Sequence, residues 1–146
     1  MRKIISIFFA GVLLLTVNVY ANFNFTLKDY LDKNDLEDGT TQIYLLKRCS
    51  AVYAYASGVI LKSDAVTSKN FIEISNNLLF KAVELKVIDE KKKLEDAQDE
   101  SEQTRKELFN IYIIDGKKNW EKNKSHFKGS YISDDMVICS KLTEDN

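Results

Sequence analysis

The sequence predicts an all-α protein, a small antiparallel bundle of four to five helices that follows an N-terminal signal peptide and is stapled by one disulfide. The 146 residues include no proline and only 5 glycines, whereas all-β folds usually need both residue types at their turns. Apolar residues recur at spacings of three and four over long stretches, which is typical of amphipathic helices. The length fits one domain, which we expect to comprise residues 22–146.

The first 21 residues have the three parts of a signal peptide. Arg2 and Lys3 precede an apolar run over residues 4–17, and about 14 residues is the length of a signal core but short of the ~20 that span a bilayer. The residues before Asn22 fit cleavage between Ala21 and Asn22. The alternative is an uncleaved N-terminal anchor, against which the short apolar run argues.

Two helices are predicted in the first half of the domain. Thr26 can cap a short helix over residues 27–33. The second helix starts around Thr40 or Thr41, ends near Lys62 and is apolar over much of its circumference, as the central helix of a bundle normally is. Its main stripe consists of Leu45, Cys49, Val52, Ala56 and Val59.

The second half is predicted to hold the remaining helices. A third helix opens at Asn70 and carries an apolar stripe to Ile88, after which residues 89–107 are almost entirely charged or polar. This run can be part of one long exposed helix, or it can contain a helical turn between residues 96 and 101. We favour two helices joined there, because a compact bundle prefers helices of similar length.

The last two predicted helices are bounded by a glycine and a serine. The helix that resumes at residue 107 should end at Lys128 and Gly129. Ser133 should cap the final helix, with Asp134 and Asp135 in its first turn, where carboxylates complement the positive helix end.

The two cysteines, Cys49 and Cys139, both fall on apolar stripes of predicted helices. A signal peptide directs them to an oxidising compartment, where two inward-facing cysteines of a small domain are most simply a disulfide. It would close a loop of about 90 residues, worth about 4–5 kcal/mol in the chain-entropy model. We therefore expect the two Cα atoms to lie within about 4.4–6.8 Å.

Other roles for the cysteines fit the sequence less well. There is no Cys-x-x-Cys redox motif and no closely spaced set of cysteines and histidines as in zinc sites. A thiol nucleophile would have only His126 as its base. Two buried free thiols would remain if export failed.

No catalytic, cofactor or metal site is predicted. His126 lacks a recognisable nucleophile motif nearby, so a solvated or capping role fits it better than that of a general base. Asp134 and Asp135 do not match the spacing of a calcium loop. Lysines surround Trp120, but acidic residues intervene, and we expect Trp120 to lie in the core with the lysines at its fringe.

The function that the sequence favours is that of an exported, non-enzymatic accessory module that binds a protein or peptide. One alternative is a hydrolase or lyase that uses His126 with an acidic partner. The other is a carrier of a small apolar ligand inside the bundle, suggested by the tyrosines Tyr44, Tyr53, Tyr55 and Tyr112. A net charge of −1 and export argue against a nucleic-acid partner, and cleavage of the signal would leave no membrane anchor. We expect the mature protein in a periplasm or outside the cell.

The first testable prediction concerns the signal. Protein purified from its own host should begin at Asn22, because Ala21 completes the cleavage pattern. N-terminal sequencing or intact mass measures this directly. A chain that keeps Met1 and stays in the membrane fraction would contradict it.

Overall fold

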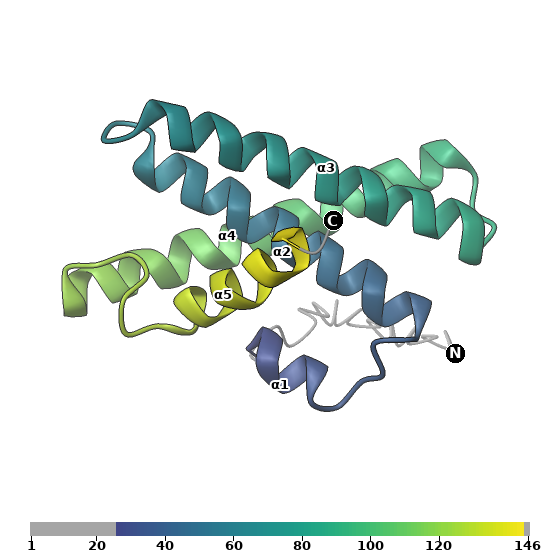
Figure 1. Ribbon diagram of the computed structural model, residues 1–146, viewed down its shortest axis with the longest axis horizontal. Coiled ribbons are helices and arrows are strands. Elements are labelled where there is room, and N and C mark those ends of the chain that lie inside the picture. The colour runs from purple at the N-terminus through teal and green to yellow at the C-terminus, as the bar shows by residue number, and fades with distance from the viewer. Residues whose placement is uncertain (1–25, 145–146) are drawn as a thin grey trace, which may run out of the picture.

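The computed structural model describes residues 26–144, and this part of the chain is all-α, as predicted (Figure 1). The predicted signal peptide lies outside the described residues, so its cleavage stays a prediction. The five helices are α1 (Leu27–Leu31), α2 (Gly39–Ile60), α3 (Ala65–Asp89), α4 (Leu94–Asn123) and α5 (Tyr131–Glu144).

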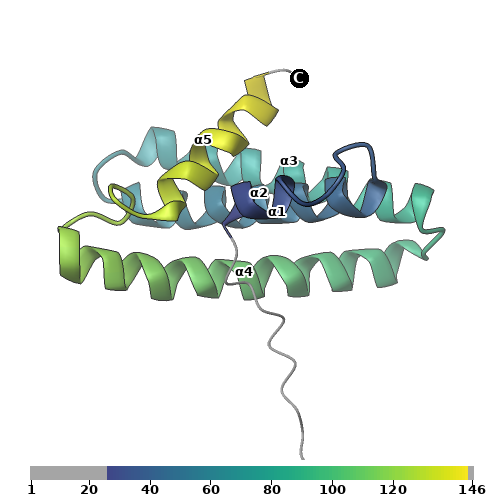
Figure 2. The ribbon, with the colours of Figure 1, turned by 90° about the horizontal axis from the view of Figure 1, so that it is seen from below.

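Helix α2 is the centre of the bundle, which confirms the prediction from its apolar circumference. It contacts all four other helices, and 13 of its 22 residues are buried, against 7 of 25 in α3. Val52 is fully buried within it. Figure 2 shows α4 running along one side of the α2–α3 pair while α5 crosses on the other side.

Aspartates cap the N-termini of α2 and α3. The side chain of Asp38 accepts a hydrogen bond from the backbone N–H of Thr41 at 2.8 Å, and Asp64 accepts one from Thr67 at 3.0 Å. Such caps satisfy backbone donors that a helix leaves unpaired. Because of the Asp64 cap, α3 starts at Ala65, earlier than the predicted start at Asn70.

The predicted junction between residues 96 and 101 is wrong. The chain turns earlier, at residues 90–93, where Lys91 adopts a left-handed conformation with φ 53°, and α4 then continues without a break. Ala97 and Ser101, one turn apart, are both fully buried, so this segment is the packed first part of a helix. Glu100 fixes the turn through ion pairs with Lys86, at 2.6 Å, and with Lys92.

The end of α4 also differs from the prediction. The helix stops at Asn123 rather than at residues 128–129, and Lys124 takes a left-handed conformation. The side chain of Asn119 donates hydrogen bonds to the carbonyls of Ser125, at 2.7 Å, and Lys128, at 3.1 Å. These bonds fold the following loop back onto α4. Helix α5 then begins at Tyr131, two residues before the predicted cap.

Two pairs of serines join α2 to α3. Ser50 and Ser75 each donate to the backbone carbonyl of the other at 2.7 Å, and Ser57 and Ser68 do the same at 2.8 and 3.0 Å. The serines of each helix are seven residues apart, two turns along one face. Their small side chains let the two helices approach closely while every hydroxyl keeps a partner.

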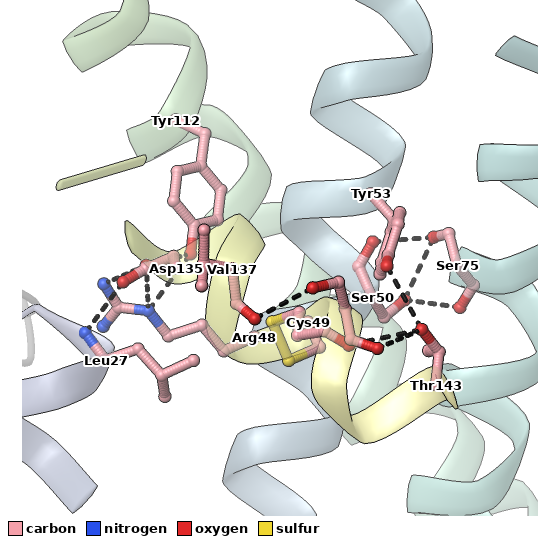
Figure 3. Close-up of a disulfide and its surroundings, with 12 residues drawn as sticks. Leu27, Arg48, Cys49, Ser50, Tyr53, Ser75, Tyr112, Asp135, Val137 and Thr143 are labelled. Carbon is pink, nitrogen blue, oxygen red and sulfur yellow. Dashed lines mark hydrogen bonds and ion pairs between the residues drawn. A yellow bond between two sulfur atoms is a disulfide. The ribbon is translucent and has the colours of Figure 1, made fainter. Parts of the chain in front are cut away.

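The predicted disulfide is present and joins α5 to α2 (Figure 3). Cys49 and Cys139 are fully buried, and their Cα atoms are 5.4 Å apart, inside the expected range. One turn further along α5, Thr143 is 3.3 Å from the hydroxyl of Tyr53 on α2. The short final helix is therefore held covalently to the central one.

Asp135 lies one turn before Cys139 and is the hub of a buried polar cluster (Figure 3). It is fully buried, and its carboxylate accepts hydrogen bonds from the guanidinium of Arg48 at 2.8 and 2.9 Å and from the hydroxyl of Tyr112 at 2.7 Å. The backbone N–H of Leu27, at the start of α1, donates to its other oxygen at 3.0 Å. One carboxylate thus connects α1, α2, α4 and α5.

The neighbours of each buried group in this cluster determine its protonation state. Burial by itself would lower the pKa of Arg48, but Tyr112 and Asp135 beside it raise the pKa, and the net shift is upward. Burial raises the pKa of Tyr112 well above its usual value. The cluster therefore holds a protonated guanidinium and a neutral phenol. The expectation that Asp135 complements the helix end together with Asp134 is wrong for Asp135, because its side chain points inward to Arg48.

The second prediction tests this ion pair. Asp135→Asn should destabilise the fold by about 3–5 kcal/mol, because it leaves the charge of Arg48 buried without a counter-charge. Chemical denaturation of the oxidised protein measures the change.

The matched control replaces both partners. Arg48→Met combined with Asp135→Leu should cost clearly less than the sum of the two single changes, since no unpaired charge then remains buried. If the free energy of unfolding of Asp135→Asn lies within about 1 kcal/mol of the parent value, the ion pair is not central to the fold.

Candidate functional site

His126, the candidate base of the enzyme hypothesis, lies in the loop after α4 and contacts two aromatic residues. Its Nδ1 is 2.9 Å from the hydroxyl of Tyr55, and its ring stacks on Trp120 with centroids 5.0 Å apart. Burial raises the pKa of Tyr55 to about 12, so the phenol stays neutral. His126 is half-buried, so it is only partly solvated, and its Nδ1 contacts Tyr55 rather than a helix end. None of the contacts that define its position is with a carboxylate.

The other sequence candidates are dispersed. Asp115 binds the hydroxyl of Tyr131 at 2.9 Å, Asp134 is exposed at the start of α5, and Asp135 belongs to the buried cluster. Within residues 26–144, no group of three or more histidine, cysteine or acidic side chains is placed to hold a metal. Trp120 is 47% exposed, so the expectation that it lies in the core is wrong.

A groove between α3 and α4 is the feature of the described chain best suited to binding. The two helices are joined at residues 90–93 and spread apart with increasing distance from that turn (Figure 1). Helix α2 forms the floor between them. The groove has a volume of about 770 Å³, within the range of ligand-binding clefts. We call it the α3/α4 groove; its lining residues are Ala54, Ile72, Asn76, Asp99, Glu102, Gln103, Arg105, Lys106 and Phe109.

Lys47, Ala54 and Gly58 follow one another along α2, and Ala54 is the one that lines the groove. Lys47 lies at the closed end, where its Nζ is 3.5 Å from the hydroxyl of Thr104 and burial, with Lys86 nearby, lowers its pKa to about 8. Ala54 is half-buried, and Gly58, one turn further, is exposed. Because α3 and α4 diverge, the floor opens progressively to solvent.

The wall formed by α4 changes chemistry along its length. Asp99 and Glu102 come first, Lys106 follows one turn later, and Phe109 comes last. The first three side chains are exposed and take part in none of the hydrogen bonds or ion pairs of the described residues. The opposite wall contributes Ile72, which is 38% exposed. The groove therefore offers acidic, basic and apolar contacts in that order.

The amides of the groove are already engaged. Asn76 of α3 accepts a hydrogen bond from Arg105 of α4 at 3.2 Å, which links the two walls. Gln103 donates to Glu107 at 2.8 Å. These contacts occupy the side-chain oxygen of Asn76 and an N–H of Gln103.

Gly116 of α4 and Gly58 of α2 differ in the space around them. A Cβ atom at Gly116 of α4 would lie 1.7 Å from the hydroxyl oxygen of Tyr55, so the packing of the bundle demands glycine there. A Cβ atom at Gly58 would meet nothing within 4 Å. Glycine within a helix costs stability relative to alanine, yet no contact within the described domain accounts for the glycine at position 58.

Sequence reasoning did not find the groove. The charged and polar character of residues 89–107 indicates exposed side chains, as the structure has them at Asp99, Glu102 and Lys106, but it does not indicate their position along a groove. Gly58 in an otherwise apolar helix is the available signal, since an isolated glycine inside a helix costs about 1 kcal/mol relative to alanine.

Comparisons of the chain with protein-family models, with curated proteins and with solved structures find no match. Among the described helices, none is both long enough and apolar enough to cross a membrane. The proposals below therefore rest on the residues themselves.

The third prediction uses the two glycines as a matched pair. Gly58→Ala should stabilise the protein by about 0.4–1 kcal/mol, because the change restricts the unfolded chain and meets open space in the fold. Gly116→Ala should destabilise it by about 1–3 kcal/mol, because the methyl group must displace Tyr55. Thermal or chemical denaturation measures both changes. A destabilising effect of Gly58→Ala would show that this glycine serves the fold.

Proposed function

We propose that this chain is an exported, non-enzymatic accessory module that binds a protein or peptide partner in the α3/α4 groove. The observation that carries the proposal is the combination of three exposed charges without partners among the described residues and an apolar end at Ile72 and Phe109. A binding surface combines apolar contact area with charges that orient the partner. The disulfide is consistent with an oxidising compartment.

The enzyme alternative has weaker support. A general base needs access to a substrate and is normally oriented by a third group. His126 contacts the phenol of Tyr55 and the indole of Trp120, and it does not line the groove. Comparing His126→Ala with the parent in a turnover screen tests this alternative.

The ligand-carrier alternative also has weaker support. It rested on tyrosines inside the bundle, but their hydroxyls are engaged with protein groups. The partners of Tyr44, Tyr53, Tyr55 and Tyr112 are Arg48, Thr143, His126 and Asp135. Native mass spectrometry of protein from its own host would reveal a retained small molecule and so favour a carrier.

The fourth prediction is a crosslinking experiment in the native host. A photoreactive phenylalanine analogue replaces Ile72 or Phe109 in the groove, and Val137, which is 56% exposed on α5, serves as the matched control. Both groove positions should give the same discrete crosslinked protein, and the control position should not. Crosslinks that are equally strong from Val137, or absent from both groove positions, would overturn the proposal.

A further inference from the structure

We infer that the occupant of the α3/α4 groove is an amphipathic α-helix of the partner, with a basic side chain, an acidic side chain and an apolar side chain on successive turns of one face. This inference rests on the proposed function and specifies the shape and charge of the partner. It follows from the backbone of the groove, the size of its floor and the order of its charges.

The backbone of the groove suits a helical occupant better than an extended peptide. All three surrounding elements are helices, whose internal N–H and C=O groups are already paired, so no strand edge is available for pairing. The side-chain oxygen of Asn76 accepts from Arg105 and the side-chain nitrogen of Gln103 donates to Glu107, so neither amide can pair through both its ends with a peptide backbone without giving up a contact. An extended peptide would lose water from its backbone without gaining partners, whereas a helix satisfies its own backbone groups.

The floor of the groove suits the close approach of a helix. The floor presents the methyl group of Ala54, and the bare backbone of Gly58 lies one turn further along α2, next to the residues that line the groove. Open space surrounds the Cα of Gly58 on the side where a Cβ would stand. Side chains of an incoming helix can therefore pack directly against α2, as ridges pack into grooves between helices.

The charges of the α4 wall set the pattern of the partner. Glu102 and Lys106 are four residues apart, which is about 6 Å along a helix axis, so their counterparts lie about one turn apart on a partner helix. A lysine or arginine should face Asp99 and Glu102, an aspartate or glutamate should face Lys106, and an apolar side chain should face Phe109. Like charges placed opposite these residues would oppose binding.

The test uses synthetic helical peptides as probes. The first peptide carries Lys, Glu and Leu at positions i, i+4 and i+8 of one face, the second exchanges Lys and Glu, and a third is the first with a proline at its centre. Fluorescence anisotropy measures their affinity for the purified protein at physiological salt. The first peptide should bind about tenfold more tightly than the second, since several exposed charge pairs change sign, and the proline peptide should not bind.

Two variants of the protein make the test specific. The double exchange Glu102→Lys with Lys106→Glu should remove the preference between the first two peptides, because it reverses the charges at positions 102 and 106 while Asp99 keeps its own. Gly58→Leu should weaken the first peptide at least tenfold, while Gly58→Ala has a smaller effect. Circular dichroism confirms that these surface variants are folded.

The outcomes separate the inference from the function on which it rests. Equal affinity for the first peptide and its proline form, or a preference that the double exchange leaves unchanged, overturns the helical occupant. If crosslinks from Ile72 and Phe109 still identify one protein, the proposed function stands without it. If no crosslink forms at either position, the proposed function fails, and the inference fails with it.

Discussion

The arrangement of the helices depends on the ion pair and the hydrogen bonds of the buried carboxylate of Asp135. A carboxylate removed from water costs several kcal/mol unless it is paired and hydrogen-bonded, and here Arg48, Tyr112 and the backbone of Leu27 meet that need. Each partner comes from a different helix. The five-residue α1, too short to be stable alone, is held in place by the hydrogen bond from its first N–H to Asp135 and by the buried side chain of Leu27.

The ion pair and the disulfide enforce the same register. Asp135 and Cys139 lie one turn apart on α5, and their partners Arg48 and Cys49 are neighbours on α2. A shift of α5 by one turn would break the covalent bridge and strand two charges in the core together. The geometry that satisfies one of these interactions satisfies the other, so alternative packings of this short helix are strongly disfavoured.

The sequence predicted what depends on local pattern and on counting. Two cysteines on apolar stripes allow one pairing, which the predicted signal peptide favours, and the apolar circumference of α2 indicates a central helix. It did not predict the role of Asp135, because an aspartate near a helix start has a sufficient local explanation as a dipole partner. Its true partner, Arg48, is 87 residues away, and nothing local identifies it. The serine pairs were missed for the same reason, since each serine makes sense only opposite the other helix.

The α3/α4 groove is likewise a consequence of non-local packing. One side of α2 is occupied by α5 through the ion pair and the disulfide, and another is occupied by α3 through the serines. Glu100 holds α4 close to α3 near their hairpin, and Arg105 of α4 reaches Asn76 of α3 further along. Where the two helices diverge, Ala54 of α2 stays half-buried and Gly58 exposed. Both residues lie on a helix that is fixed from two other directions, and the groove walls are regular helices rather than loops. A partner that enters the groove therefore meets a preformed surface, and less of the interaction free energy is lost to ordering the binding site.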